Sequence, residues 1–412
     1  MTLPWDTTLL GAVASVVMGQ SPPSTTYNSS GDGLPFLQGK AEFGDRSPTP
    51  VKFCARPLRV AQQGSVLVSV RAPVGDSNIA DREYCIGRGL AALIPKRVLD
   101  AEFLLAWLQL RRKELDACGS GTTFRSINRD VLEQFQVPLP SLSEQRAIAT
   151  VLRTVAQAKD STEKVIAATR QLKQSLLNHL FTYGPVPFDE ANQVSLKETE
   201  IGALPRHWST TRLGEHALIG NGSTPKRTES RYWDGGTIPW LTSGKVHEGT
   251  IRAADEFVTE AARHECHLPV VPKESLVVAI TGQGKTLGNA AILAIDACVS
   301  QHLAYVTLNG ADLVPAFVLA FLRSRYDQLQ AASRGGGSTK GALTCGFLKL
   351  FEIPFPSLSE QRAIAWHLSV VDARIAAEEG RSAALVDLSR SLLRHLLTGE
   401  VRLPEFANAQ QS

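Results

Sequence analysis

Two stretches, VPLPSLSEQRAIA at residues 137–149 and IPFPSLSEQRAIA at residues 353–365, decide the fold of this chain. They share an identical core, SLSEQRAIA, and lie 216 residues apart. The match continues more weakly, at the same offset, to LKQSLLNHLFT (172–182) and LSRSLLRHLLT (388–398). Solenoid repeats have periods of about 20–50 residues, so this much longer period indicates duplication of a whole domain.

The duplication extends upstream of these stretches at offsets that grow in small steps from 203 to 216, as expected when loops gain residues. The matching positions are Trp5, Leu10 and Gly11 with Trp208, Leu213 and Gly214; Lys40 and Gly44 with Lys245 and Gly249; Cys85 and Leu90 with Cys298 and Leu303; and GSGTT (119–123) with GGGST (335–339). We therefore predict two copies of one unit, each a globular part followed by a helical part.

The helical parts begin at the repeated stretch. Ser141 with Glu144, and Ser357 with Glu360, have capping-box spacing, in which hydroxyl and carboxylate each satisfy a free N–H at the helix start. Apolar residues then follow the four–three spacing of a coiled-coil seam, and about 40 residues form a rod of roughly 60 Å. The predicted packing residues are Ile148, Leu152, Val155, Leu176, Leu180, Ile364, Leu368, Val371, Leu392 and Leu396.

The globular parts are mixed and rich in strands. SVLVSV (65–70) and SLVVAI (275–280) are short β-type runs, whereas residues 102–117 and 315–332 are amphipathic and predict helices. The expected fold class is α+β, with two mixed globular parts separated by long paired helices. The expected boundaries are 1–136, first globular part; 137–184, central helical region; 185–204, linker; 205–352, second globular part; 353–400, C-terminal helical region; and 401–412, tail.

Composition limits the classes of protein that fit. The 412 residues carry a formal net charge of +3, and six scattered cysteines form no C-x-x-C pair, which favours a reduced cytoplasmic protein. No apolar run reaches the roughly 20 residues of a membrane span, and the N-terminal residues do not resemble a signal peptide.

The candidate motifs for nucleotide binding, metal binding and catalysis are each incomplete or absent. TGQGKT (281–286) resembles the end of a phosphate-binding loop, but Ala279 stands where that pattern requires glycine, and the next residues read as a strand. His264, Cys266 and His267, with Cys298 and His302, fit no standard zinc spacing, so we expect no metal. The chain also lacks E-x-K, [ND]-P-P-[YF] and G-x-S-x-G motifs, so an enzyme is disfavoured.

Two glycine-rich segments have residues that suit the binding of phosphate groups. GSGTTFRSINRD (119–130) and RGGGSTKGALT (334–344) combine glycine, hydroxyl and basic residues, which suit phosphate oxygens, and they recur at corresponding positions. Basic residues beside other turns reach phosphates or base edges in the same way. The candidate contacts are Lys40, Arg71, Arg88, Thr122, Thr123, Arg125, Lys245, Gln283, Lys285, Arg334, Ser338, Thr339 and Lys340.

The repeated helix start and two further segments resemble a known protein family. The duplicated P-x-P-S-L-S-E-Q-R-A-I-A helix start resembles the conserved regions of type I restriction–modification specificity subunits. SVRAPVGDSNIADREYCIGRGLAAL (69–93) is similar to their target-recognition domains, and KETEIGALPRHWSTTRLGE (197–215) to the entry into the second of these domains. The resemblance covers essentially the whole chain.

The resemblance implies a non-catalytic subunit that binds double-stranded DNA. Each globular part would be a target-recognition domain that reads one half of a split site. The helical regions would pack antiparallel, set the gap between the half-sites and dock two methyltransferase subunits, which restriction and translocase subunits would join. S-adenosylmethionine, ATP and Mg would belong to those partner subunits, and this chain would carry no cofactor.

An alternative from a different class is a duplicated protein–protein scaffold without DNA readout. The small net charge argues mildly against DNA when it is taken alone. However, residues 1–136 and 205–352 each carry 15 basic and 13 acidic side chains, so the positive excess lies wholly in the globular parts. This distribution fits a chain that supplies selectivity while its partners supply much of the phosphate contact.

Overall fold

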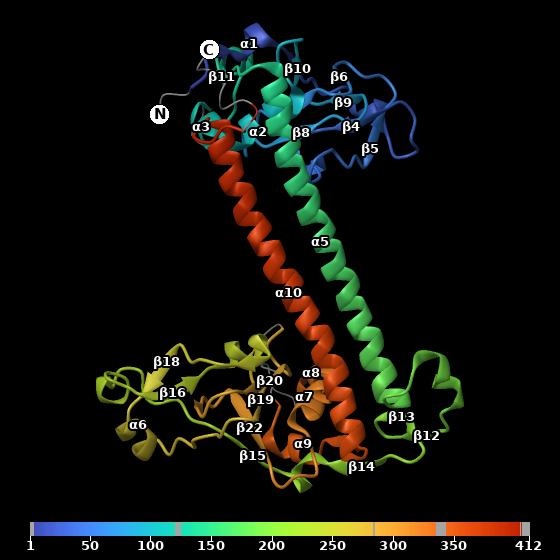
Figure 1. Cartoon of the computed structure of the whole chain (residues 1–412), viewed down its shortest axis with the longest axis vertical. Helices are drawn as coiled ribbons and strands as arrows, with labels where there is room; N and C mark the ends of the chain where they lie inside the picture. Colours follow the sequence, from blue (N-terminus) through green and yellow to red (C-terminus); the bar gives the residue numbers. More distant parts are fainter. Residues whose placement is uncertain (1–3, 120–124, 283–284, 335–342, 404, 406–412) are drawn as a thin grey trace. The chain divides into compact units, whose positions relative to one another are not determined.

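The computed structural model describes residues 4–119, 125–282, 285–334, 343–403 and 405 (Figure 1). The chain divides into two compact units. Unit 1 comprises Met1–Lys164 and Glu378–Ser412, and unit 2 comprises Val165–Ala377. Each unit therefore holds one globular part together with half of each long helix.

Unit 1 is built on three sheets. The short β1 pairs with β11, a four-stranded sheet has the order β2-β10-β7-β8, and a five-stranded sheet has the order β3-β5-β4-β9-β6. The strands are β1 Thr7–Leu9, β2 Ala14–Met18, β3 Tyr27–Asn28, β4 Leu34–Leu37, β5 Lys52–Cys54, β6 Val60–Ala61, β7 Val66–Ser69, β8 Ser77–Ile79, β9 Tyr84–Ile86, β10 Leu90–Pro95 and β11 Gln136–Pro138.

Unit 2 repeats this plan with different edge strands. β14 pairs with β23, a five-stranded sheet has the order β15-β22-β19-β20-β17, and a three-stranded sheet has the order β18-β16-β21. The strands are β14 Ser209–Arg212, β15 Ala217–Asn221, β16 Ile238–Leu241, β17 Thr250–Ile251, β18 Glu256–Val258, β19 Leu276–Ala279, β20 Ala290–Leu293, β21 Cys298–Val299, β22 Leu303–Leu308 and β23 Glu352–Phe355.

The strand registers show how closely the two units match. Phe36 on β4 lies opposite Cys85 on the parallel strand β9, and Trp240 on β16 lies opposite Cys298 on the parallel strand β21. Both cysteines are fully buried. The duplication predicted from the sequence therefore holds at the level of individual residue pairs.

The helices of the globular parts are each interrupted once. Residues 102–117 were expected as one helix, but α2 (Ala101–Leu110) and α3 (Arg112–Ala117) are separated at Arg111. In the same way, α7 (Pro315–Ser324) and α8 (Tyr326–Arg334) are separated at Arg325. Each of these arginines lies 5.2 Å over the aromatic ring four residues before it, so the same local cation–π contact accompanies both breaks.

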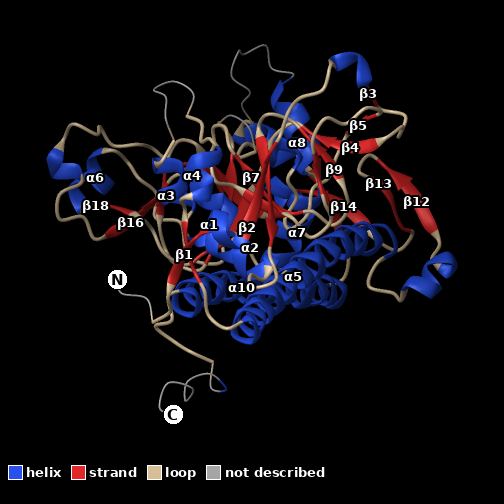
Figure 2. Ribbon diagram, turned by 90° about the horizontal axis from the view of Figure 1, so that it is seen from above, coloured by secondary structure: helices blue, strands red, loops and turns tan. Residues whose placement is uncertain are grey.

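The two longest helices are α5 (Leu142–Tyr183) and α10 (Leu358–Leu397). In unit 1 the start of α5 shares a hydrophobic core with the end of α10, and in unit 2 the end of α5 shares a core with the start of α10. Within each unit the halves of α5 and α10 lie side by side (Figure 2) and run antiparallel (Figure 1). α5 ends one residue before Gly184 (φ 84°) and α10 two residues before Gly399 (φ 71°), and glycine adopts these positive angles without a Cβ clash.

Residues 185–204, expected as a linker, are ordered. They contain a short 3-10 helix (Phe188–Gln193) and most of the hairpin β12 (Leu196–Thr199)–β13 (Gly202–Pro205). Ile201 and Leu204 are buried in the unit 2 core. Apolar burial therefore fixes a segment whose composition alone looked like a loose connection.

All six cysteines are free thiols. Across the described ranges, no helix combines the length and the hydropathy required to cross a membrane.

Candidate nucleic-acid interface

In unit 1 the glycine-rich segment that starts at Gly119 returns beside the end of strand β7. The Ile127 N–H donates to the Val70 carbonyl at 3.0 Å, and the Ala72 N–H donates to the Arg125 carbonyl at 3.0 Å. These bonds hold the described end of the glycine-rich segment against the turn that follows β7. Two loops that are distant in sequence therefore emerge together.

Unit 2 repeats this junction. The Leu343 N–H donates to the Ile280 carbonyl at 2.8 Å. Leu343 lies at the described end of the second glycine-rich segment, and Ile280 ends the run that contains β19. The loop of residues 281–288 thus starts beside the end of that segment, as the loop of residues 71–76 does in unit 1.

Three predicted cations of unit 1 lie on exposed residues. Arg71, Arg88 and Arg125 are all exposed, and Arg125 forms an ion pair with Asp116 at 3.3 Å. Lys40 lies further along the surface, where its ammonium group contacts Asp76 at 2.5 Å. Arg71 and Arg125 lie at the paired loops, and Asp116 offsets only one of these two charges, so a positive charge that suits phosphate is left at this junction.

In unit 2 the two predicted lysines that the structure describes differ sharply. Lys285 is exposed in the 281–288 loop, and its carbonyl accepts a hydrogen bond from the Tyr326 hydroxyl at 2.9 Å. Lys245 is only 13% exposed and contacts both Glu248 (2.7 Å) and Asp255 (2.8 Å). These hydrogen bonds raise the pKa of Lys245 above its ordinary value. Its charge is already compensated, so we leave Lys245 out of the proposed contact set.

Several sequence predictions fall on residues that the structure does not describe. Thr122, Thr123, Gln283, Ser338, Thr339 and Lys340 lie outside the described residues, and so does the side chain of Arg334. Their assignment to DNA contact stays a prediction.

The structure adds a polar cluster in unit 2 that sequence reasoning missed. His247 contacts the Thr286 hydroxyl at 3.0 Å and the Asn289 amide at 3.3 Å, while Thr281 contacts His302. All five residues lie in or beside the 281–288 loop. Imidazole, hydroxyl and amide groups match the donors and acceptors of base edges.

One member of this cluster has no possible equivalent in unit 1. His302 aligns with Gly89, where a Cβ would lie 2.6 Å from the Gln38 carbonyl oxygen. Unit 1 therefore has no room for a side chain at the position where unit 2 carries an imidazole. The offset of 213 residues between Cys85 and Cys298 pairs His302 with Gly89, but only contacts in space show that the imidazole lies beside the 281–288 loop.

Among the residues that the structure describes, no group of three or more histidine, cysteine or acidic side chains is arranged to hold a metal ion.

The predicted packing residues lie on the inner faces of α5 and α10. Ile148, Leu180, Ile364, Leu368 and Leu396 are buried to within 4% exposure. Leu152, Val155, Leu176, Val371 and Leu392 are half-buried.

The repeated stretch positions the start of each long helix through its glutamine. The Gln145 side chain accepts from the Asp100 N–H (2.8 Å) and donates to the Val98 (3.0 Å) and Pro140 (2.9 Å) carbonyls. Gln361 makes the same three bonds at 2.8, 3.0 and 3.1 Å. Both glutamines are fully buried, so the helix starts are tied to the globular parts identically in the two units.

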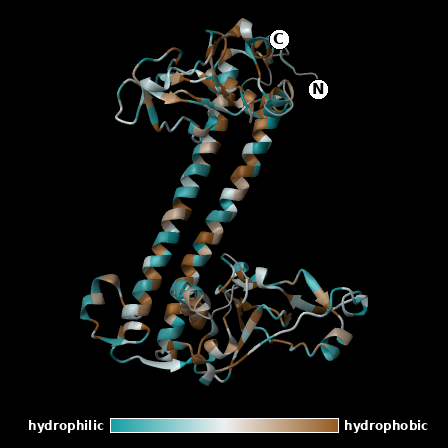
Figure 3. Cartoon of the chain, turned by 180° about the vertical axis from the view of Figure 1, so that it is seen from behind, coloured by the Kyte–Doolittle hydropathy of each residue, from teal (hydrophilic) through white to brown (hydrophobic). Residues whose placement is uncertain are grey.

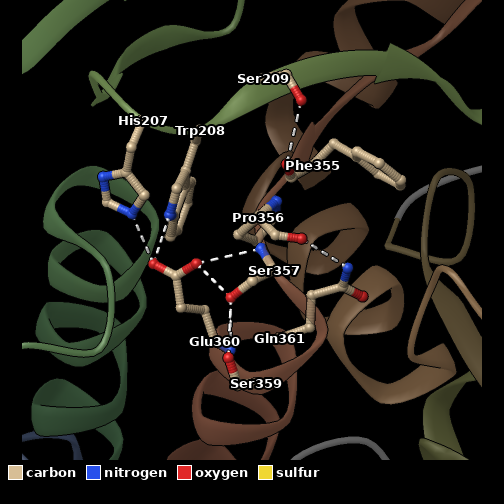
Figure 4. Close-up of polar contacts among 9 residues, drawn as sticks. All are labelled: His207, Trp208, Ser209, Phe355, Pro356, Ser357, Ser359, Glu360 and Gln361. Carbon is tan, nitrogen blue, oxygen red and sulfur yellow. Dashed lines mark hydrogen bonds and ion pairs between the residues drawn. The ribbon is translucent and has the colours of Figure 1, made fainter.

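The capping box forms fully only at the second helix start. The Ser357 N–H donates to the Glu360 carboxylate at 3.1 Å, and the Glu360 N–H donates to the Ser357 hydroxyl at 3.4 Å (Figure 4). The same carboxylate accepts from His207 and from the Trp208 indole, both at 2.8 Å. In unit 1 the corresponding Glu144 carboxylate instead binds Arg402.

We expect acid to remove the stabilisation that Glu360 gives to unit 2. Burial alone raises the pKa of the Glu360 carboxyl, but hydrogen bonds from His207, Ser357 and Trp208 outweigh it and hold the pKa below the ordinary 4.5. A depressed folded pKa gives stabilisation that is complete above the unfolded value and is lost as the pH falls through the folded value. Urea unfolding of the full chain and of Glu360→Gln should therefore converge on acidification; a pH-independent difference would contradict this.

Comparison with known proteins identifies the family. The pattern described as "Type I restriction modification DNA specificity domain" matches residues 4–170 and 205–386. The chain belongs to this family. The two matched segments correspond to the two copies that the sequence repeat defines.

Relatives and solved structures agree with this assignment. A relative from Methanocaldococcus jannaschii, named as the MjaX type I restriction enzyme specificity subunit, is 41% identical over 181 residues. These residues make up 43% of this chain and 43% of that protein. The MjaVIII specificity subunit of the same organism is 21% identical over 97% of this chain and 93% of its own length. The crystal structure of the type I restriction–modification S subunit from M. genitalium, 17% identical, matches with a TM-score of 0.63 over 96% of both chains. That likeness shows the fold.

Proposed function

We propose that this chain is the DNA-specificity subunit of a type I restriction–modification complex and that it reads a two-part asymmetric DNA target, one part per unit. The observation that carries the proposal is the repeated loop junction beside Val70 and Ile280. The same framework presents two loops in each unit, but the side chains differ, with Arg71 and Gly89 in unit 1 and Thr281 and His302 in unit 2. Equal frameworks with unequal loops suit two different half-sites.

The chain itself has no catalytic role in this proposal. The methyltransferase subunits would supply S-adenosylmethionine, and the restriction and translocase subunits would use ATP and Mg. The half-sites would then be recognised by base contacts, each wrong base pair costing about 1–3 kcal/mol.

Sequencing of methylated adenines in a host that carries this chain and its partner subunits tests the proposal. A motif of two fixed parts separated by an unspecified gap is the expected result. In parallel, DNA affinity should fall steeply with salt, by about a thousandfold between 50 and 200 mM if about six phosphates are contacted. A flat salt response without a methylation motif would favour the protein–protein scaffold instead.

The partner surface in this proposal is the outer side of the long helices. Hydrophobic segments recur along α5 and α10 (Figure 3). In unit 2, Leu172 is 52% exposed, Trp366 62% and Val370 49%. Unit 1 has a groove of about 490 Å³, lined by α2, α5 and α10 and including Leu105, Leu152 and Leu393. Such exposed apolar surface is typical of interfaces with partner proteins.

Replacing Trp366 by alanine is expected to weaken capture of the methyltransferase subunits by about 30-fold or more, because buried tryptophans are often interface hot spots worth 2 kcal/mol or more. Stability of the chain should change by no more than about 0.5 kcal/mol, since the side chain is exposed. Leu350→Ala is the matched control, because Leu350 is 63% exposed but lies on α9 (Cys345–Leu350). Equal capture by wild type and Trp366→Ala in a titrated pull-down would remove Trp366 from the surface.

A further inference from the structure

Unit 1 contains a polar cavity of about 290 Å³ that the proposed loop contacts do not use. It lies between α2, the start of α3, strand β8 with the turn before it, and the segment that follows β4. The residues that matter for its chemistry are Lys40, Phe43, Asp76, Asn78, Gln109 and Arg112.

Asn78 is buried in the wall of this cavity, and its side-chain oxygen lacks a hydrogen-bond donor within the described part of the chain. The side chain is 1% exposed, and its amide N–H donates to the Gly44 carbonyl at 2.7 Å. Its Oδ1 finds no partner among the described residues, and neither does the buried hydroxyl of Ser77, which also lines the cavity. A buried acceptor without a donor costs about 1–3 kcal/mol, so the wall favours a ligand that brings an N–H group.

The charged residues of the cavity favour a ligand with acceptors as well. The Asp76 carboxylate accepts from Lys40 at 2.5 Å and from the Arg112 Nε at 2.8 Å. Two cations share one carboxylate, so the cluster keeps an excess of one positive charge. This excess disfavours a cationic ligand and favours oxygen or ring-nitrogen acceptors.

The same place in unit 2 is filled by the chain's own arginine. Helices α2 and α7 both have ten residues, and Gln109 and Arg323 are the ninth residue of each. The Arg323 Nε donates to the Ala290 carbonyl at 3.0 Å. A Cβ on Gly249, the counterpart of Gly44, would lie 3.1 Å from the Arg323 guanidinium. A planar group with N–H donors therefore occupies in unit 2 the place that is open in unit 1.

The strands confirm that the two places correspond. Ser77 and Asn78 lie opposite Val68 and Leu67 in unit 1, while Ala290 and Ala291 lie opposite Val278 and Val277 in unit 2. Unit 2 thus has alanines where unit 1 has the two unpartnered polar side chains. Unit 1 thus has an open polar site where unit 2 fills the corresponding place with its own side chain.

We propose that the unit 1 cavity receives a single nucleobase of the bound DNA, turned out of the helical stack. This inference rests on the proposed DNA-binding function. A base is planar, carries an N–H donor for Asn78 and offers acceptors to Lys40 and Arg112, and Phe43 lines the site where a ring face can pack. The volume is close to the roughly 300 Å³ lower limit of small-ligand pockets, which suits one base.

Mismatched DNA tests this inference with the full chain and its methyltransferase subunits. Duplexes carry the mapped target with one mismatch placed in turn at each position of a half-site. An already unpaired base costs less to extrude, so at one position the mismatched duplex should bind about tenfold tighter than the matched duplex. At that position 2-aminopurine fluorescence should rise on binding. Gln109→Arg, which copies unit 2, should abolish both effects while the steep salt dependence remains.

Asn78→Ala is the second variant, because unit 2 carries Ala291 at that register and folds. It should reduce the mismatch preference to threefold or less. Gln62→Arg, at an exposed position, controls for the added charge and should keep the wild-type preference.

Absence of any tighter-binding position in the wild type, or insensitivity of that preference to Gln109→Arg, would overturn the inference and leave the proposed function intact. Weaker methyltransferase capture by Gln109→Arg, with unchanged mismatch preference, would assign the cavity to a partner's side chain and equally overturn it. If the wild-type protein with its methyltransferase subunits showed no salt-dependent DNA binding at all, the proposed function itself would be overturned.

Discussion

Replacing Arg402 by alanine is expected to lower the free energy of unfolding of unit 1 by about 3–5 kcal/mol, the usual cost of leaving one member of a buried ion pair unpaired. The Glu144 carboxylate is 3% exposed and the Arg402 side chain 15% exposed. Arg402 donates through two nitrogens, at 2.9 and 2.8 Å, to the two carboxylate oxygens. Such two-point contacts are strong and geometrically specific.

The position of this pair makes the effect specific to unit 1. Arg402 follows the end of α10, and Glu144 lies in the first turn of α5. Near the same junction, a Cβ on Gly399 would lie 2.2 Å from the Pro4 ring, so the two ends of unit 1 pack closely. Hydrogen exchange of the full chain should show lost protection in unit 1 and unchanged protection in unit 2.

A matched double variant separates the ion pair from packing. Glu144→Gln with Arg402→Gln removes both charges, so it should recover much of the stability that Arg402→Ala loses. A loss below about 1 kcal/mol in Arg402→Ala would mean that water or another group compensates Glu144. Equal losses in the single and double variants would show that the Arg402 stem, not its charge, stabilises unit 1.

The sequence predicted the helices and strands that both copies share, and it missed side-chain contacts that differ between the copies. Identical letters at 141–149 and 357–365 predicted both long helices, and the strands around Val66 and Leu276 followed from short apolar runs. The Glu144 contact could not be predicted in this way, because the same capping-box letters bind Arg402 in unit 1 and His207 with Trp208 in unit 2. The partner of a side chain depends on distant segments that local spacing does not encode.

The interrupted helices and the unit 1 cavity show the same limit. An amphipathic pattern runs unbroken through Arg111 and Arg325, so periodicity predicts one helix where the structure has two. Likewise, the change from Arg323 to Gln109 is one ordinary surface-type difference in the aligned sequences. Only the matching strand registers show that it empties a buried site.

Gln145→Ala is expected to destabilise unit 1 by about 3 kcal/mol, although it removes no charge and little apolar surface. The variant leaves the Asp100 N–H and the Val98 and Pro140 carbonyls without their partner in a fully buried place, and each such group costs about 1–3 kcal/mol unless water enters. Asp100 also caps α2 by accepting from the Glu102 and Phe103 N–H groups, so the loss should spread from the start of α5 into α2.

Thermal and urea unfolding of Gln145→Ala, Gln361→Ala and the double variant measure this effect. Each single change should loosen one unit by a similar amount, because the three bonds are the same in both, and the two losses should add, because distant sites are independent. Arg146→Ala is the control: it is the next residue along α5, its side chain is 67% exposed, and it removes only a long surface ion pair with Asp100 (3.9 Å), so its change should stay within about 1 kcal/mol. Gln145→Glu keeps the acceptor for Asp100 and loses both donors, so its stability should not exceed that of wild type. A Gln145→Ala protein as stable as Arg146→Ala would mean that the repeated stretch is kept for its surface and not for this buried anchor.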